Sequence, residues 1–278
     1  MKYLKLSFTL LISAFVLSTL TGCVTTLNHH NSSVVTYLYP NQTEPIETSH
    51  IPVLSLPLKV GIAFVPEFDM NRNLTERDKL DLMNEVSKHF KQYAFVKSIA
   101  IIPSAYLRPQ GSFSNLNQIR TMFGIDVIAL ISYDQSQFTD QGVASISYWT
   151  LLGAYVVSGE RNDTHTMVDA AVYHIKSRKM LFRAPGISHI KGKATPVNLS
   201  EQLRVDTMKG FQEASLNLVT NLDEQLELFK EKTKESPEDF QVVHKPGYTG
   251  GGYADEYFAL IGIILGVFYI WQVARRKI

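Results

Sequence analysis

The chain has 278 residues, of which 45% are hydrophobic, with a formal net charge of +1 and a single cysteine. The balanced charge excludes the basic surface with which proteins bind nucleic acid, and a single cysteine excludes an internal disulfide. The central part of the chain is long enough to bury one hydrophobic core. Composition therefore predicts one globular domain, and the more specific signals lie at the two ends.

The first 22 residues have the composition of a secretory signal peptide. Lys2 and Lys5 precede an apolar run over residues 6–20, and small residues follow this run. A charged start, a short apolar region and a small-residue cleavage site distinguish such a leader from a spanning helix. The run ends in Leu20-Thr21-Gly22-Cys23, which resembles the lipobox of bacterial lipoproteins.

The lipobox resemblance implies two processing steps at the N-terminus. Lipoprotein-processing enzymes would attach a diacylglycerol to Cys23 and cut after Gly22, which leaves a mature N-terminus that carries several acyl chains of the palmitate type. Several chains give a stable membrane anchor, whereas one chain binds only marginally. Val24 stands where an inner-membrane retention signal has Asp, so the expected destination is the outer membrane.

Residues 23–57 are predicted to form a polar tether. They are rich in Thr, Asn, Ser and His and contain four prolines, a composition typical of extended linkers. His29 and His30 could bind a metal ion loosely, but no cysteine, carboxylate or further histidine stands at ligand spacing. We therefore expect this segment to be solvated.

Residues 58–232 are predicted to form the folded α/β domain. Apolar runs at 59–65, 95–102 and 127–133 indicate buried strands. Thr75 and Asp78 form a capping-box pattern before one helix, and Asn115 and Gly124 stand at the ends of a second, shorter helix. The resulting β-α-β-α-β order predicts parallel strands joined by crossover helices.

The second half of the domain is predicted to be an antiparallel meander followed by a long helix. Strands are expected over 145–158, 164–175 and 180–190, with turns at 159–163 and 176–179, so that the whole sheet is mixed. The first of these strands is apolar on both faces, which indicates a buried central strand or, alternatively, an edge that meets another subunit or the membrane. The expected partners therefore include a second copy of the chain.

A helix from Ser200 to about Lys232 closes the domain, with Ser200 as its N-cap and an apolar stripe along one face. Residues 233–249 are predicted to be a polar linker. The architecture is similar to the TolB N-terminal and CsgG-like class of periplasmic lipoprotein domains, and this likeness concerns the fold alone.

The C-terminal tail, residues 250–278, has three parts. Gly250, Gly251 and Gly252 precede an apolar segment over 257–274, which ends at the basic residues Arg275, Arg276 and Lys277. The apolar segment is near the lower length limit of a transmembrane helix, and the basic stop favours a cytoplasmic C-terminus. A permanent membrane anchor is one interpretation of this tail.

The three glycines indicate a second interpretation. A glycine cluster before a short span and a basic stop resembles the GlyGly-CTERM signal, which is cut by rhombosortase, a rhomboid-type intramembrane serine protease. Glycine disfavours helix formation, and such proteases need helix-poor substrate backbone near the membrane surface.

Together, the lipobox and the GlyGly-CTERM signal resemble the rhombotarget lipoprotein family. Segments 126–135, 148–150 and 177–186 of the body add to the resemblance. It implies an envelope lipoprotein that stays in the inner membrane until its tail is cut and then reaches the outer membrane, on its periplasmic face or at the cell surface. Cleavage removes a conflict, because a chain bound for the outer membrane cannot also keep a helix in the inner membrane unless it bridges the two.

The search for catalytic chemistry finds no recognised motif. There is no H-E-x-x-H and no G-x-S-x-G, and the glycine-bearing segment 186–194 departs from a phosphate loop in spacing and in ending on Ala194. Ser188 and His189 are neighbours, so strand geometry directs them to opposite faces. Other side chains considered for acid–base or metal chemistry are Asp126, Asp134, Asp163, Asp169, His165, His174 and His189.

We expect the histidine spacings to follow hairpin geometry rather than a ligand motif, and the aspartates to serve turns and strand ends. The sequence therefore predicts no catalytic residue, no cofactor and no metal site. The predicted function is a non-enzymatic envelope lipoprotein whose domain serves protein binding or assembly. The alternatives are an inner-membrane protein anchored at both ends and a hydrolase with an Asp/Ser/His site formed by folding.

Overall fold

The computed structural model describes residues 25–40, 51–66, 74–141, 155 and 158–248. The helices are α2 (Val34–Leu38), α3 (Glu76–Phe90), α4 (Ser112–Phe123) and α6 (Leu199–Glu235), with a short 3-10 helix at Ser104–Tyr106. The strands are β1 (Thr25–Asn31), β2 (Val53–Leu56), β3 (Leu58–Phe64), β4 (Val96–Ile102), β5 (Val127–Gln141), β6 (Glu160–His174), β7 (Lys179–Ala194) and β8 (Gln241–His244).

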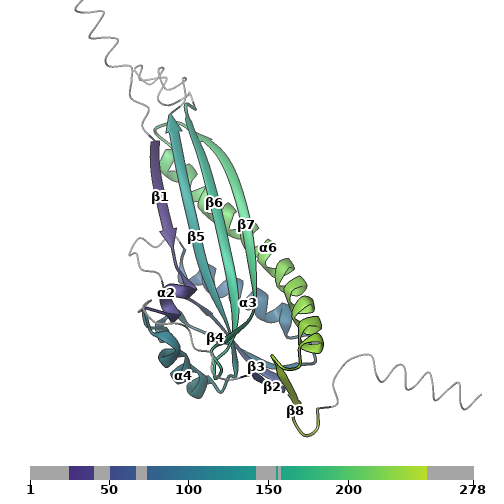
Figure 1. Cartoon of the computed structure of the whole chain (residues 1–278). Helices are drawn as coiled ribbons and strands as arrows, with labels where there is room; N and C mark the ends of the chain where they lie inside the picture. The colour runs from purple at the N-terminus through teal and green to yellow at the C-terminus, as the bar shows by residue number, and fades with distance from the viewer. Residues whose placement is uncertain (1–24, 41–50, 67–73, 142–154, 156–157, 249–278) are drawn as a thin grey trace, which may run out of the picture.

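The main sheet is mixed, as the sequence predicted. Its strand order is β4-β3-β5-β6-β7, and β1 also pairs with β5. β3 is parallel to β4 and to β5, which confirms the β-α-β-α-β first half, while β5, β6 and β7 are antiparallel neighbours. These three strands are much longer than β3 and β4, so they extend past the rest of the sheet to a distal tip (Figure 1).

The half of the molecule opposite the distal tip is called the lower half below (Figure 1). There, helices cover both faces of the sheet. One core cluster joins β5 residues Ala129 and Ile131 to α3 and α6. The other joins the alternate residues Ile128 and Leu130 to α2 and α4. Successive side chains of a strand point to opposite faces, so cover on both sides explains why β5 begins as an unbroken apolar run.

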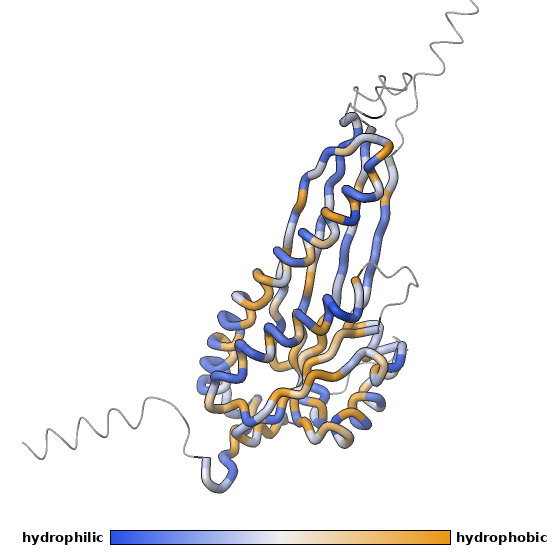
Figure 2. The backbone as a smooth tube through the Cα atoms, turned by 180° about the vertical axis from the view of Figure 1, so that it is seen from behind, coloured by the Kyte–Doolittle hydropathy of each residue, from blue (hydrophilic) through white to orange (hydrophobic). Residues whose placement is uncertain are grey.

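In the distal half, the sheet has a helix on one face. The N-terminal part of α6 lies against the strands there (Figure 2), and the side chains beneath it are buried and mostly polar, including Gln135, Gln137, Asn162 and Thr164. The opposite side of these strands is called the open face below. Because the buried residues are polar, hydrophobicity indicated a third strand ending at Tyr133, whereas β5 continues to Gln141.

The predicted tether of residues 23–57 is wrong for much of its length. β1 pairs with the distal edge of β5, α2 buries Tyr37 and Leu38, and β2 pairs with β8. Backbone hydrogen bonds hold β1, so the strand needs no apolar pattern. At its end, the Ser32 hydroxyl accepts a hydrogen bond from the Tyr133 amide at 2.8 Å.

The predicted meander is shifted along the chain. Its first strand is β5, and the predicted turn at 159–163 is wrong because residues 160–163 lie in β6. The predicted strand 145–158 lies almost wholly outside the described residues, and neither Tyr155 nor Ser158 is in a strand. The predicted turn at 176–179 is close, since β7 begins at Lys179.

The helix ends show which local sequence signals were sufficient to predict where a helix begins or ends. The capping box of Thr75 and Asp78 is confirmed, and Gly124 ends α4 in the left-handed conformation. Asn115, however, lies inside α4, where its carbonyl oxygen accepts hydrogen bonds from Tyr37 and from the Arg108 amide. Ser200 does not cap α6, which begins at Leu199 with Asn198 as its N-cap residue.

The predicted linker at 233–249 also contains structure. α6 continues to Glu235, and β8 adds to β2 as a parallel strand. Among the described residues, no helix is both long and apolar enough to cross a membrane. The predicted transmembrane segment, residues 257–274, lies outside the described part of the chain.

Candidate functional site

The lower half of the molecule contains an apolar pocket between α3, α6 and the sheet. Its volume is about 370 Å³, within the range of small-molecule sites. The sheet supplies Val60, Ile62, Val127, Ala129, Ile131, Ala170 and Val172 to its lining, and the helices supply Val86, Phe90, Leu222, Leu226 and Phe229.

The polar residues of this pocket come from one side. They are Lys230 and Thr233 at the end of α6, and His244 and Tyr248 at and after β8. Lys230 Nζ bonds Glu227 Oε1 at 2.6 Å and lies 5.2 Å from the ring centre of Phe95. The pocket therefore pairs an apolar interior with a basic, hydrogen-bonding margin.

A carboxylate joins the two helices beside this pocket. Asp223 of α6 accepts hydrogen bonds from Tyr93 at 2.9 Å and from His89 at 2.6 Å, with one oxygen for each. Burial, and then the hydrogen bond to Asp223, raises the pKa of Tyr93 to about 12, so the phenol stays protonated and remains a donor at neutral pH. This contact fixes the separation of α3 and α6 at one end of the pocket.

The open face of the distal sheet carries a row of histidines. Strand pairing aligns His29 of β1 with Ser136 of β5, Ser136 with His165 of β6, and His165 with His189 of β7. Residues directly opposite in neighbouring antiparallel strands have Cβ atoms about 4.5–5.5 Å apart. Three histidines that are distant in sequence therefore share one line across the sheet.

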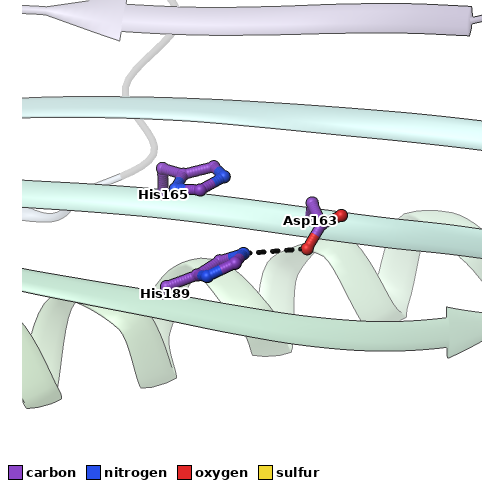
Figure 3. Close-up of side chains that lie close together, drawn as sticks. All are labelled: Asp163, His165 and His189. Carbon is purple, nitrogen blue, oxygen red and sulfur yellow. Dashed lines mark hydrogen bonds and ion pairs between the residues drawn. The ribbon is translucent and has the colours of Figure 1, made fainter.

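Two of these histidines form a compact cluster with Asp163. The rings of His165 and His189 are stacked with centres 4.0 Å apart and planes 16° apart, and His189 Nε2 lies 2.9 Å from Asp163 Oδ1 (Figure 3). One donor atom from each of the three residues lies within 4.8 Å of the others. Both histidines are exposed and Asp163 is half-buried.

The spacing of Asp163, His165 and His189 gave no sign of this cluster. Asp163 and His165 share a face because they are two residues apart on one strand. His189 joins them through the β6–β7 register, which a ligand motif in the sequence does not encode. The signal that could have identified it was the pairing of the two strands about their turn, because that register places His165 opposite His189.

The four candidate aspartates do not converge, since each faces a different basic side chain. Asp134 bonds His29 at 3.0 Å, Asp163 bonds His189, Asp169 bonds Arg183 at 2.7 Å, and Asp126 lies 4.0 Å from Lys245. Burial raises the pKa of Asp169, and the hydrogen bond from Arg183 opposes this shift.

The remaining candidate residues lie apart from the cluster. His174 is buried at the other end of β6, where its Nδ1 contacts Ser177 Oγ at 2.8 Å. Ser188 is buried beneath α6 while His189 is exposed on the open face, which confirms that the two do not form a catalytic pair. Segment 186–194, considered as a phosphate loop, is part of β7.

The processing residues predicted from the sequence lie outside the described part of the chain. They are Gly22, Cys23, Gly250, Gly251, Gly252, Arg275, Arg276 and Lys277. The structure does place the described residues closest to them in sequence. Thr25 pairs with Asp140 at the distal tip, and Tyr248 follows β8 at the opposite end.

No protein-family model matches the chain, and no curated protein matches it. Among solved structures, the chain is similar to a neuraminyllactose-binding hemagglutinin homolog from Helicobacter pylori. The sequences are 12% identical, the TM-score is 0.39, and the alignment covers 69% of this chain and 96% of the other. At this level of similarity, neither a family nor a function carries over.

Proposed function

We propose that the protein is a bacterial envelope lipoprotein of the rhombotarget type, lipidated at Cys23 and cut near Gly250, Gly251 and Gly252 by a rhombosortase-like protease. Its body is a non-enzymatic α/β domain for protein binding or assembly, related in architecture to the TolB N-terminal and CsgG-like class. The β-α-β-α-β half, the antiparallel half and the closing helix support this relation.

The observation that carries the proposal is the position of the described residues that lie closest in sequence to the two predicted processing sites. Thr25, two residues after Cys23, pairs with Asp140 at the distal end of β5. At the other end, Lys245 lies 4.0 Å from Asp126, the residue before β5, and the Tyr248 amide bonds the Lys245 carbonyl. Because a strand rises about 3.3 Å per residue, these two points are about 45 Å apart.

This separation limits how both ends can be anchored. Residues 249–256 separate Tyr248 from the apolar tail segment and span at most about 30 Å when extended. If the lipid at Cys23 holds the distal tip against the membrane and the body stands upright, the tail cannot reach the same bilayer. With both anchors in one bilayer, an intact tail would require the body to lie along the membrane surface. Cleavage of the tail would allow the body to stand upright on the lipid anchor.

The sequence at the distal tip supports the same orientation. β5 ends at Gln141 and β6 begins at Glu160, and these two residues pair with each other. The chain between them contains Ile146, Tyr148, Trp149, Leu151 and Leu152. An apolar segment that leaves and rejoins the sheet beside the lipidated end suits contact with a membrane or with a second subunit.

The intact mass of the native protein, extracted from its own membranes, tests this proposal. We expect a species that begins at a lipidated Cys23 and ends near Gly250–Gly252. A Gly251→Leu/Gly252→Leu variant should keep the full tail and remain in the inner membrane. Cys23→Ser serves as a control that abolishes the lipid mass while the tail signal is unchanged. A wild-type protein that keeps its tail would instead establish a permanent anchor at each end.

The apolar pocket favours a second function, the binding of one unbranched acyl chain. The interior suits a hydrocarbon chain, and Lys230 at the margin suits a carboxylate. Displacement of a fluorescent fatty acid measures this binding. Ala170→Phe, which places a large side chain in the pocket, should abolish this binding. Lys230→Gln should weaken the binding of a fatty acid more than the binding of the matching fatty alcohol. Equal binding by wild type and Ala170→Phe would exclude the pocket as the site.

A further inference from the structure

We propose that Asp163, His165 and His189 bind one divalent transition-metal ion on the open face of the distal sheet (Figure 3). This site is independent of the proposed processing and of the apolar pocket. It rests on the geometry of three side chains and on the chemistry of their donor atoms.

The arrangement of the backbone already suits a shared ligand. The β6–β7 ladder fixes His165 directly opposite His189 and Asp163 opposite Lys191, so the three donors come from two adjacent strands of a continuous sheet. Strand backbones are rigid relative to loops, and donors on rigid elements keep their separation when no ion is bound. The ion therefore does not have to order the chain in order to bind.

The distances are close to those of a coordination sphere. Zinc binds imidazole nitrogen and carboxylate oxygen at about 2.0–2.2 Å, which places neighbouring ligand atoms about 3.0–3.5 Å apart. His189 Nε2 and Asp163 Oδ1 are already 2.9 Å apart. All three donors lie within 4.8 Å, so rotation of the exposed ring of His165 brings in the third ligand.

The donor set selects the class of ion. Two imidazoles and one carboxylate suit zinc, nickel or copper, whereas calcium and magnesium prefer sites made of oxygen alone. Three protein ligands leave at least one coordination position for water or for a group from a partner. Lys191, opposite Asp163, opposes the charge of the ion, so we expect micromolar rather than nanomolar affinity.

The histidine row also supplies a nearby comparison. His29 lies in the same row, but Ser136 separates it from His165, and Asp134 bonds its Nε2. In α3, His89 is paired with Asp223 at 2.6 Å. Among the described residues, neither pair has a third ligand residue close enough to share an ion, so neither should bind the ion comparably.

Isothermal titration of the EDTA-treated full chain with zinc chloride at neutral pH tests the inference. We expect one site, with affinity reduced more than about tenfold by His165→Ala or by His189→Ala, since each removes a ligand. His89→Ala and His29→Ala are the matched controls and should bind like wild type. Circular dichroism verifies that each variant is folded. This is expected for His29, His165 and His189, whose side chains are exposed, while His89 is half-buried and bonded to Asp223, so the fold of His89→Ala is checked before its affinity is compared.

Electron paramagnetic resonance with copper(II) gives a second readout that a structural effect would not change. Wild type should show two coordinated imidazole nitrogens, and each single histidine variant should show one. The absence of zinc binding at 100 µM, or equal binding by His165→Ala, His189→Ala and wild type, would overturn the proposal. Loss of binding in His29→Ala alone would assign the ion to the N-terminal histidines instead.

Discussion

His29 of β1 bonds Asp134 of β5, with 3.0 Å between Nε2 and Oδ1 across a sequence separation of 105 residues. The contact accompanies the antiparallel pairing of β1 with β5. The sequence of β1 is typical of a linker, but this pairing makes it a strand of the sheet. Thr25, two residues after the predicted lipidation site, is therefore already part of the fold. A lipid on Cys23 would hold the sheet close to the membrane rather than at the end of a long tether.

The first prediction concerns α2, the helix inside the predicted tether. Tyr37 is 1% exposed and donates a hydrogen bond to Asn115 Oδ1 at 2.8 Å. Tyr37→Ala should lower the free energy of unfolding by about 3–5 kcal/mol because it empties a core position. Tyr37→Phe, which removes the hydroxyl alone, should cost about 1 kcal/mol. Urea unfolding followed by circular dichroism measures both, and a negligible effect of Tyr37→Ala would show that α2 is not part of the core.

The second prediction concerns the contact of β7 with α6. A Cβ atom built on Gly186 would collide with the carbonyl oxygen of Ala214 and lie 2.5 Å from the Leu218 amide nitrogen. These are backbone atoms of a helix and cannot move separately. Gly186→Ala should therefore destabilise the domain by about 2–3 kcal/mol.

The neighbouring residue provides the control for Gly186. Ile187 is 61% exposed on the open face, so Ile187→Ala should change stability by less than about 0.5 kcal/mol. Thermal unfolding of the two variants gives the comparison. If Gly186→Ala were as stable as Ile187→Ala, α6 would not pack against β7 at this distance.

Local signals predicted the lower half of the fold well and the distal half poorly. The apolar runs at 59–65 and 127–133 identified strands because a two-sided core imposes hydrophobic patterns. The capping box at Thr75 identified a helix because its side chains bond the free backbone amides of the first turn. Beyond Tyr133, the buried side of β5 is polar, so the pattern weakens while the backbone ladder continues. The histidine cluster could not be predicted, because it depends on the β6–β7 register, which is a tertiary property. In contrast, the alternation of side chains along a strand was sufficient to place Ser188 and His189 on opposite faces.

The third prediction concerns the polar layer beneath α6. Gln137 Nε2 donates to Leu203 O at 3.0 Å and contacts the hydroxyls of Thr164 and Thr207 at 3.2 and 3.1 Å. Gln137→Leu removes the amide partner of these two buried hydroxyls, and should lower the free energy of unfolding by about 1–3 kcal/mol.

Asn162 is the contrasting case in the same layer. It is 1% exposed, and within the described part of the chain its side-chain amide has no hydrogen-bond partner. Asn162→Leu should therefore raise the free energy of unfolding by about 1 kcal/mol, because it removes a buried amide without breaking a bond. Urea midpoints that shift in the same direction for Gln137→Leu and Asn162→Leu would contradict this account.

The last prediction is a dependence of stability on pH that originates at His174. Burial lowers the pKa of its imidazole below the ordinary value of 6.5, and Arg120 and Lys176 act in the same direction, while Asp126 opposes them. The Ser177 amide donates to Nδ1 at 3.3 Å, which requires that nitrogen to be unprotonated.

The direction of the pH effect follows from where the proton binds. Well above pH 6.5, the imidazole is neutral in both the folded and the unfolded chain, so its titration does not change stability there. As the pH falls through that value, His174 binds a proton in the unfolded chain but remains neutral in the folded chain, where its pKa is lower. The free energy of unfolding should therefore decrease from pH 7.5 to pH 5.5.

Substitution by asparagine isolates the contribution of His174. The asparagine side-chain oxygen can accept a hydrogen bond from the Ser177 amide, but the asparagine does not titrate. The His174→Asn variant should therefore lose less stability between pH 7.5 and pH 5.5 than wild type. Asp169 has the opposite effect, because its raised pKa favours the folded chain in acid. It is present in both wild type and His174→Asn, so its contribution cancels when the two are compared. Urea unfolding at the two pH values gives the comparison. Equal losses in both proteins would show that another group is responsible for the acid sensitivity.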